Sequence, residues 1–386
     1  MIHRIVKIPE KSSYFLFGPR QTGKSTFINS IYSSAIWKVN LLLSDVLLKY
    51  SKDSSQFRKE AEEKINNEGI EIIFIDEVQK IPALLDEVHY LIEKYPKCRF
   101  VLTGSSARKL KRGGANLLAG RAVERHLFPF VYEEIQDKFD LDTILLFGSL
   151  PALFEKSASE KQDILKAYVN TYLKEEILSE GIIRNLGGFS RFLDIAASQF
   201  GELVNFSNIA RECSVPVRTV QSYYSILEDT LLGFSLQAYR KSARKRMSAH
   251  SKFYFFDNGV TNAVNKQLTA GVDSFLKGRL FEQFIILEAY RKLNYNLSEA
   301  NMFFWKTSHG AEVDLLIEKH GKIIAAFEIK AGSNIGGANL MGIKAFKQEH
   351  AEVPCFIVCT AENAFDHGNI KVLPWKSFLS RLNEWL

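Results

Sequence analysis

The residues Gly18-Pro19-Arg20-Gln21-Thr22-Gly23-Lys24-Ser25 decide the fold of this chain. The apolar run Tyr14–Phe17 precedes them, and Lys24–Ile31 reads as a helix. A strand, a glycine-containing loop and a helix in this order are the context in which such a loop binds phosphate. Gly18 and Gly23 let the backbone curl so that N–H groups point at phosphate oxygens. A chance glycine-rich turn is the alternative, but every fixed position of the motif is matched.

The side chains of this loop predict a nucleotide and a metal ion. Lys24 can reach the β- and γ-phosphates, and the Ser25 hydroxyl can bind Mg²⁺. We therefore expect ATP with Mg²⁺ as the ligand. The residues expected to contact the nucleotide are Gly18, Pro19, Arg20, Gln21, Thr22, Gly23, Lys24, Ser25, Thr26 and, further along the chain, Arg121.

Two acids follow the next buried strand. The run Ile72–Ile75 is continuously apolar, as in a parallel sheet covered on both faces, and Asp76 and Glu77 come directly after it. Ligands of open α/β sheets bind at the carboxyl ends of strands. Asp76 is expected to hold the metal ion, directly or through water, and Glu77 to polarise the attacking water. Without the phosphate loop, the same pattern would be a strand that runs into a solvated turn.

Two further residues leave alternatives open. Ser105 follows the buried strand Phe100–Leu102 and can bond the γ-phosphate or the attacking water, or it can cap a helix. Arg121 can contact phosphate or form a structural ion pair. Strands that alternate with helices predict a doubly wound α/β domain over residues 1–150.

The middle of the chain has a different pattern. Residues 151–200 read as a helical linker, and residues 201–270 as a winged helix-turn-helix. Asn208–Cys213 and Val217–Leu227 would be its two helices. The basic run Arg240–Arg246 would be the wing, where it suits contacts to DNA phosphates. A solvated hairpin is the alternative.

Paired carboxylates appear near the end of the chain. Glu312–Ile317 and Ala326–Lys330 read as two strands joined around His320-Gly321. A three-residue loop, 320–322, would pair 319 with 323, and therefore Asp314 with Glu328. Alternation puts Lys330 on the face of Glu328. Two carboxylates can hold Mg²⁺, and a lysine can orient the water.

Together these segments resemble the prokaryotic AAA-type ATPases that carry a C-terminal PD-(D/E)XK nuclease-like domain of unknown function. The resemblance implies a restriction-endonuclease-like fold over residues 271–386. It implies metal binding by Asp314 and Glu328, with Glu282 as a further acid. Phe147–Pro151 is similar to the family's Gly-Gly-x-Pro turn, with Ser149 in place of the second glycine. Pro151 would then lie near the adenine or, alternatively, start a helix. The resemblance is carried by Gly18–Ser25, Ile75–Gln79, Leu102–Ser105, Ala119–Arg121 and Leu127–Phe130.

Composition narrows the class of protein. The chain has 386 residues, 46% of them apolar, and no apolar stretch long enough for a membrane span. Met1–Ile5 lead directly into a strand-like segment, so we expect a cytoplasmic protein. The four cysteines are expected to be reduced core residues. A net charge of +6 permits an anionic partner but does not prove one.

Three functions are compatible with these observations. The first is an ATP-dependent DNA-processing enzyme in which nucleotide state controls the C-terminal nuclease. The second is a nucleotide-gated switch whose C-terminal domain is catalytically silent and binds DNA or a protein partner. The third is a helicase-like or clamp-loader-like motor, which is weakened because no trans-acting arginine can be picked out. An oligomer is compatible with each.

Overall fold

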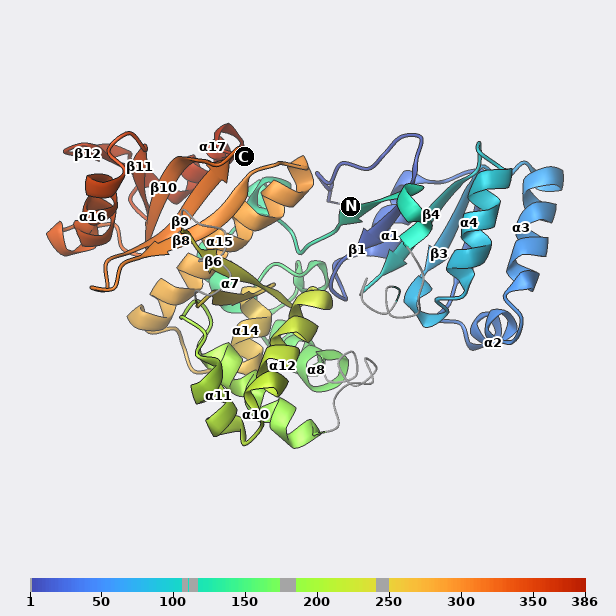
Figure 1. Cartoon of the computed structure of the whole chain (residues 1–386), viewed down its shortest axis with the longest axis horizontal. Helices are drawn as coiled ribbons and strands as arrows, with labels where there is room; N and C mark the ends of the chain where they lie inside the picture. Colours follow the sequence, from blue (N-terminus) through green and yellow to red (C-terminus); the bar gives the residue numbers. More distant parts are fainter. Residues whose placement is uncertain (1, 106–109, 111–116, 174–184, 241–249) are drawn as a thin grey trace. The chain divides into compact units, whose positions relative to one another are not determined.

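The computed structural model describes residues 2–105, 110, 117–173, 185–240 and 250–386 (Figure 1). Its contacts group the chain into two compact units. The N-terminal unit comprises His3–Phe128 together with Asp229–Leu232. The C-terminal unit comprises Pro129–Glu228 and Gly233–Leu386. Residues 129–150 thus belong to the C-terminal unit, whereas the sequence analysis grouped them with the N-terminal domain; the four-domain division remains a prediction.

The N-terminal unit is built on a parallel sheet of five strands, in the order β2-β3-β4-β1-β5. β1, β3 and almost all of β4 are buried, as their continuous apolar runs predicted. Because β4 lies between β1 and β3, the carboxyl ends of these three strands are neighbours. The strands are β1 (Ser13–Phe17), β2 (Ile36–Asn40), β3 (Ile72–Asp76), β4 (Arg99–Gly104) and β5 (Ala122–His126).

The helices of this unit bury apolar side chains against the sheet. Phe15 and Phe17 of β1 alternate with residues on the other face and pack in one core with Ile73 and Ile75 of β3. Leu84, Leu85, Val88 and Leu91, at helical spacing, close that core from α4. The helices are α1 (Lys24–Ile31), α2 (Ser44–Lys52), α3 (Ser55–Glu68) and α4 (Leu84–Lys94), with 3₁₀ turns η1 (Val78–Lys80) and η2 (Leu117–Gly120).

The first half of the C-terminal unit is helical. α11 and α12 lie where the two helices of the helix-turn-helix were predicted, and Ser214 between them has a positive φ of 55°. Of the basic run, Arg240 is described; residues 241–249 lie outside the described part of the chain. The helical segments are α6 (Tyr132–Ile135), η3 (Gln136–Lys138), α7 (Leu141–Phe147), η4 (Pro151–Leu153), α8 (Ala158–Ala167), η5 (Tyr168–Leu173), α10 (Leu186–Ser198), α11 (Phe206–Cys213), α12 (Val217–Asp229) and α14 (Asn258–Val264).

The second half contains a mixed sheet of eight strands, in the order β12-β13-β11-β10-β9-β8-β6-β7. The helix α15 contacts β10, and α16 packs its apolar residues against the sheet (Figure 1). The strands are β6 (Gly233–Ala238), β7 (Lys252–Phe255), β8 (Asn301–Lys306), β9 (Glu312–Lys319), β10 (Lys322–Lys330), β11 (Cys355–Cys359), β12 (Phe365–His367) and β13 (Ile370–Pro374). The helical segments are α15 (Ser274–Asn296), η6 (Gly337–Leu340), α16 (Met341–Glu349), α17 (Trp375–Arg381) and η7 (Leu382–Glu384).

The hairpin β9–β10 corrects the predicted loop. Lys319 pairs with Lys322, so the turn has two residues, His320 and Gly321, and the predicted pairing of 319 with 323 is wrong. Both turn residues have positive φ, 53° and 78°, as a type I′ turn requires. The register then shifts at Ile324, which acts as a β-bulge. Beyond it Phe327 pairs with Leu315, and the continued register puts the next residue of β10 opposite Asp314.

Two further expectations can be compared with the described residues. All four cysteines are buried with free thiols. Among the helices of the described segments, none has both the length and the apolarity that a bilayer span needs.

Candidate nucleotide site and a C-terminal charge cluster

The predicted phosphate loop joins β1 to α1, in the strand, loop and helix order expected from the sequence. Gln21 and Gly23 have positive φ values of 64° and 85°. The ammonium group of Lys24 is buried and donates to the carbonyl oxygens of Gly18 (2.8 Å) and Pro19 (3.0 Å). Thr22 Oγ1 donates to the same Pro19 oxygen at 2.9 Å. The lysine therefore lies folded across the loop that is predicted to hold phosphate.

Two hydroxyl groups, one half-buried and one buried, bind Asp76 at the end of β3. Ser25 Oγ donates to Asp76 Oδ2 at 2.7 Å, and Thr103 Oγ1 donates to Asp76 Oδ1. Asp76 is only 7% exposed. Ser25 belongs to the phosphate loop and Asp76 to the end of β3, so this hydrogen bond joins the two halves of the predicted site. Both are oxygen ligands of the kind that Mg²⁺ takes, so these residues fit the predicted metal ion.

Glu77 has an orienting partner that the sequence analysis missed. Its backbone has a positive φ of 61°. Gln79 Nε2 donates to Glu77 Oε2 at 2.5 Å and to Ser105 Oγ at 3.2 Å. The buried amide thus links the candidate base to the candidate serine at the end of β4. Its sequence signal was a polar residue two positions after the second acid.

The remaining predicted nucleotide contacts are in their expected segments. Arg20 lies in the loop, and Thr26 lies in the first turn of α1. Arg121 lies between η2 and β5 and pairs with Glu93 of α4, whose pKa its hydrogen bond lowers. This arrangement matches the structural alternative for Arg121. Its contact to phosphate remains a prediction.

The turn Phe147–Pro151 is held within the C-terminal unit. Ser149 N donates to Asp257 Oδ2 at 2.8 Å, and Arg291 Nη1 donates to Ser149 Oγ at 3.0 Å. Pro151 begins η4, as the helix-start alternative described.

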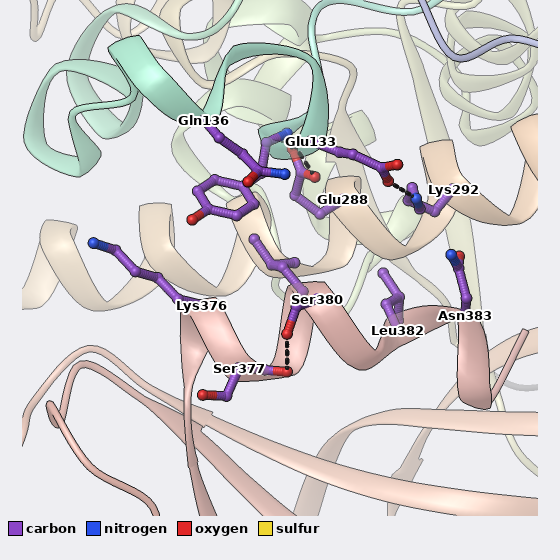
Figure 2. A pocket seen from close by; sticks show the side chains of 11 residues that line it. Glu133, Gln136, Glu288, Lys292, Lys376, Ser377, Ser380, Leu382 and Asn383 are labelled. Atoms are coloured by element: carbon purple, nitrogen blue, oxygen red, sulfur yellow. Dashed lines mark hydrogen bonds and ion pairs between the residues drawn. The ribbon is translucent and has the colours of Figure 1, made fainter.

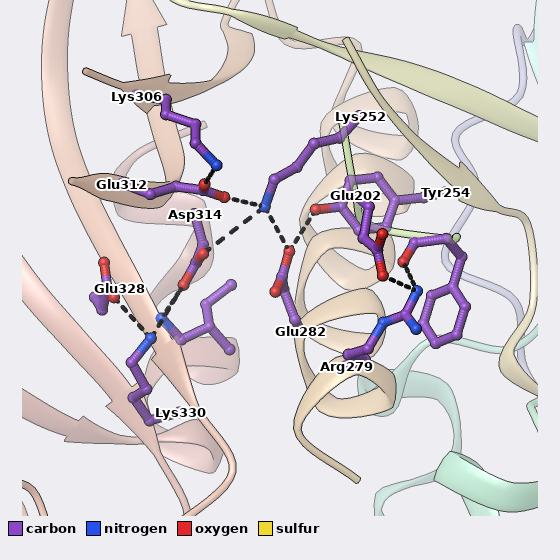
Figure 3. Close-up of polar contacts among 12 residues, drawn as sticks. Glu202, Lys252, Tyr254, Arg279, Glu282, Lys306, Glu312, Asp314, Glu328 and Lys330 are labelled. Carbon is purple, nitrogen blue, oxygen red and sulfur yellow. Dashed lines mark hydrogen bonds and ion pairs between the residues drawn. The ribbon is translucent and has the colours of Figure 1, made fainter. Parts of the chain in front are cut away.

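The predicted C-terminal residues converge on one face of the sheet (Figure 3). Lys330 Nζ lies 2.7 Å from Glu328 Oε1 and 3.9 Å from Asp314 Oδ2. The backbone N–H of Ile329 donates to Asp314 Oδ2 at 2.7 Å. Asp314 and Glu328 are 6% and 7% exposed. The bulged hairpin therefore brings together Asp314, Glu328 and Lys330.

A second lysine, which the sequence analysis did not identify, joins Glu282 to this group. Lys252 Nζ of β7 lies 3.0 Å from Glu282 Oε1, 2.5 Å from Glu312 Oε1 and 3.9 Å from Asp314 Oδ1 (Figure 3). Tyr254, two residues further along β7, donates to Glu282 Oε1 at 2.6 Å. We call Lys252, Glu282, Glu312, Asp314, Glu328 and Lys330 the charge cluster.

Burial and neighbouring charges together set the ionisation of the charge cluster. It raises the pKa of Asp314 and of Glu328 above their ordinary values, and the neighbouring carboxylates raise both further. Burial also acts to raise the pKa of Glu312, but Lys252 and Lys306 outweigh it and hold that pKa below its ordinary range. For Lys252 burial works against the charge, yet the surrounding acids raise its pKa well above the usual value.

The ammonium groups of Lys252 and Lys330 lie between these acids. Within the described segments, no three side chains of His, Cys, Asp or Glu are grouped so as to hold a metal ion. Metal binding by Glu282, Asp314 and Glu328 remains a prediction. Lys252 and Glu312 had weak sequence signals: a charge at the start of the apolar strand 252–255, and an acid two residues before Asp314.

A hollow of about 470 Å³ elsewhere in the C-terminal unit contains none of the predicted site residues (Figure 2). Glu133 pairs with Lys292 across it, and both oxygens of Glu288 accept from Tyr132 N at 3.1 Å. Its polar groups largely bind one another, so it offers less chemistry than the two sites above.

Comparison with known families divides the chain into three matched segments. Residues 10–136 match an AAA domain. Residues 138–271 match a domain of unknown function, DUF8612, and residues 277–378 match another, DUF4143.

Three similar whole proteins are described as uncharacterized. One from Mycobacterium tuberculosis is 25% identical over 82% of this chain and 70% of its own length. One from Haemophilus influenzae is 23% identical over 85% of both chains. One from Methanocaldococcus jannaschii is 22% identical over 98% of this chain and 86% of its own.

Among solved structures, the replication initiator DnaA bound to AMPPCP and single-stranded DNA is 12% identical, with a TM-score of 0.28. The match covers 56% of this chain and 82% of the DnaA chain. The family matches are the firmer guide. The chain carries an AAA-type, P-loop ATPase-like domain in its N-terminal part and a DUF4143 domain in its C-terminal part.

Proposed function

We propose that the protein binds ATP at the carboxyl ends of β1, β4 and β3 and hydrolyses it. The observation that carries the proposal is the 2.7 Å hydrogen bond between Ser25 and Asp76, with the phosphate loop on one side and Glu77 on the other. These are the hydroxyl and carboxylate that a phosphoryl-transfer site needs beside each other. The match to an AAA domain over residues 10–136 supports the same assignment.

Each residue then has a defined role. Lys24 leaves the carbonyl oxygens of its own loop and binds the β- and γ-phosphates. Mg²⁺, bound through Ser25 and Asp76, would neutralise charge that develops on the phosphates. Glu77 accepts the proton of the attacking water, and Gln79 holds its carboxylate in place. Proton transfer of this kind contributes roughly 10²–10⁴-fold to a rate.

Glu77→Gln tests the hydrolysis step. It keeps the shape of the side chain but removes the base, so ATP should still bind while turnover falls by roughly 10²-fold or more. Lys24→Ala should instead weaken ATP binding, because it removes the positive charge facing the phosphates. Nucleotide titration and a phosphate-release assay separate the two effects.

The matched control is Glu63→Gln, which makes the same change at an exposed position of α3. It should leave binding and turnover unchanged. Wild-type turnover in Glu77→Gln would show that Glu77 is not the base.

We also propose that nucleotide state controls a DNA-acting, PD-(D/E)XK nuclease-like C-terminal domain. The convergence of Asp314, Glu328 and Lys330 supports this proposal. Residues 201–270 would be a winged helix that contacts DNA through the basic run Arg240–Arg246. We propose as well that the chain has the four domains predicted from its sequence and that the protein is cytoplasmic. We also propose that Arg121 contacts the nucleotide.

A silent switch is the second candidate, and Lys252 is the observation that favours it. Its ammonium group lies where acids of a nuclease would share a metal ion. A cleavage assay on single- and double-stranded DNA and RNA, with Mg²⁺ or Mn²⁺, decides between the two. Cleavage that disappears in Asp314→Ala, with ATP turnover retained, supports the nuclease. No cleavage on any of these substrates with either metal supports the switch.

A further inference from the structure

Arg4 is a buried arginine of the N-terminal unit, and its guanidinium group bridges two main-chain carbonyl oxygens. The residue is 8% exposed. Its Nη1 donates to the carbonyl oxygen of Thr22 at 2.9 Å, and its Nη2 donates to that of Phe128 at 2.6 Å. A buried charge is costly unless hydrogen bonds compensate for it, and a planar guanidinium donates such bonds in fixed directions. Arg4 therefore links the predicted phosphate loop to the segment that follows β5.

The hydrogen bond to Thr22 determines the direction of the next N–H group in the loop. In a trans peptide, the carbonyl group of one residue and the N–H group of the next point in opposite directions. Because the carbonyl of Thr22 points to Arg4, the N–H of Gly23 points away from Arg4. The N–H groups of such a loop are the groups that bind phosphate oxygens. Arg4 thus acts on one of these donors from outside the loop.

The peptide between Thr22 and Gly23 needs a partner that fixes it. Gly23 has a φ of 85°, and glycine tolerates φ values of either sign, so this peptide could rotate and turn its N–H group out of the loop. Thr22 Oγ1 donates to the carbonyl oxygen of Pro19 at 2.9 Å, which holds the side chain but not the peptide. The hydrogen bond from Arg4 to the carbonyl of Thr22 opposes the rotation directly.

The other end of the bridge is fixed to the sheet. Leu127, the residue before Phe128, donates its N–H to the carbonyl oxygen of Phe17 in β1 at 2.8 Å. The carbonyl oxygen of Leu127 lies so close to Gly18 that a Cβ there would be 2.2 Å away. The segment after β5 therefore contacts the start of the loop directly and its later part through Arg4.

An alternative role for Arg4 would be to hold the N-terminal segment, residues 3–12, against the domain. Other arginines already bind carbonyl oxygens of that segment. Arg125 Nε of β5 donates to Lys7 at 2.9 Å, and Arg99 Nη1 of β4 donates to Glu10. The side chain of Arg4 instead leaves the segment and binds the loop. Its contacts favour a role in the loop.

We propose that Arg4 is a positioning residue of the phosphate loop, which keeps the N–H group of Gly23 turned toward a bound diphosphate group. The inference rests on the ATP site of the proposed function. Arg4 acts through the backbone of Thr22, so it favours every ligand that carries a diphosphate, whatever base is attached. Inorganic pyrophosphate with Mg²⁺ is therefore a sufficient probe.

Arg4→Met in the full chain tests the inference. The affinities for ATP and for pyrophosphate should fall by the same factor, at least roughly ten-fold, because the lost hydrogen bond has a charged donor. The KM for ATP should rise while kcat changes little, since the ground state and the transition state share this interaction. Isothermal titration calorimetry and a phosphate-release assay measure these quantities.

Arg99→Met is the matched control, because it removes the same charge and another hydrogen bond to a main-chain carbonyl. Both of its affinities should equal those of the wild type. An equal loss of affinity in the two variants would assign the effect to net charge or to the N-terminal segment, and would overturn the inference.

Nuclear magnetic resonance can observe the N–H group itself. The sequence contains two Thr-Gly pairs, Thr22-Gly23 and Thr103-Gly104, so labelling of threonine carbonyl carbon and glycine nitrogen selects these two amides. Pyrophosphate should move the Gly23 proton of the wild type to lower field, as hydrogen bonding does, and should move it less in saturated Arg4→Met. The Gly104 signal reports whether the variant is folded. A full wild-type shift in Arg4→Met would contradict the inference.

Arg4→Lys provides a second variant that keeps the positive charge but loses the planar fork. It should bind pyrophosphate several-fold more weakly than the wild type, and wild-type affinity would overturn the inference even if Arg4→Met failed to fold. No binding of ATP or pyrophosphate by the wild type would remove the proposed function and the inference with it. Binding by the wild type, with unchanged affinity in the folded Arg4 variants, would remove the inference alone.

Discussion

Gly18, the first residue of the phosphate loop, lies against the backbone carbonyl of Leu127. Substitution of Gly18 by alanine, which adds one methyl group, therefore tests the geometry of the loop. A Cβ at Gly18 would lie 2.2 Å from the carbonyl oxygen of Leu127. Because backbone atoms cannot swing away, the loop must shift in Gly18→Ala. We expect ATP affinity to fall by at least roughly ten-fold, or about 1.4 kcal/mol, in a nucleotide titration.

Gly69→Ala is the comparison for this change. Gly69 ends α3 with a positive φ of 66°, but nothing lies near its Cβ position. The substitution should destabilise the fold by about 1 kcal/mol and leave ATP affinity unchanged. Equal loss of ATP affinity in both variants would mean that the effect of Gly18→Ala is general instability.

At the same scale, the sequence predicted residues that belong to a motif and missed their partners. Lys24, Ser25 and Asp76 could be named because their spacing is fixed by a strand, a loop and a helix. Gln79 and Lys252 could not be named in this way, because their roles depend on residues that are distant in sequence. The fold brings Ser105 beside Gln79 and Glu282 beside Lys252.

At the scale of elements, continuous apolar runs predicted the buried strands β1 and β3, and helical spacing predicted α4. The hairpin β9–β10 shows the limit of such reasoning. Its turn is one residue shorter than predicted, and the bulge at Ile324 supplies the missing residue within the strand. Alternation cannot distinguish an extra residue in a turn from one in a bulge, since both leave Asp314 opposite Glu328.

The long helix α15 contains a buried acid whose effect on stability depends on pH. Burial raises the pKa of Glu288 from 4.5 to about 7, although Arg291 opposes the shift. Between these values the folded state keeps a proton that the unfolded state has released. The contribution of Glu288 to stability is therefore present below pH 4.5 and is lost as the pH rises to about 7, by up to about 3 kcal/mol.

Glu288→Gln removes this titration. The free energy of unfolding of the variant minus that of the wild type should be larger at pH 8 than at pH 5. Denaturant unfolding followed by tryptophan fluorescence measures both free energies. Glu63→Gln, at an exposed position, should show the same difference from wild type at both pH values. A pH-independent difference for Glu288→Gln as well would show that Glu288 is ionised throughout this range.

At the scale of the whole molecule, each compact unit contains one of the two candidate sites. The phosphate loop and its acids lie in the N-terminal unit, and the charge cluster lies in the C-terminal unit. The order of these sites along the chain followed from their motifs. The limits of the units did not, because residues 129–150 contact segments that are distant in sequence, such as Asp257 and Arg291.

The basic run gives the last prediction, which concerns how the whole protein would bind DNA. Arg244, Lys245 and Arg246 lie outside the described residues, so the prediction rests on sequence alone. Cations that neutralise phosphates release counterions, and each contact adds about 0.9 to the slope of log affinity against log salt concentration. Changing all three residues to alanine should lower that slope by about 2 to 3 and weaken binding to every DNA sequence alike.

The control removes the same number of charges from exposed lysines of the N-terminal unit, Lys11, Lys52 and Lys59. If net charge alone governed the affinity, both triple variants would weaken binding equally, because each lowers the net charge of +6 by three. A contact surface instead predicts a reduced salt slope for the first variant and a wild-type slope for the second. Identical slopes in all three proteins, measured by fluorescence anisotropy over a salt series, would make the basic run a solvated face and leave the DNA-binding proposal without its main support.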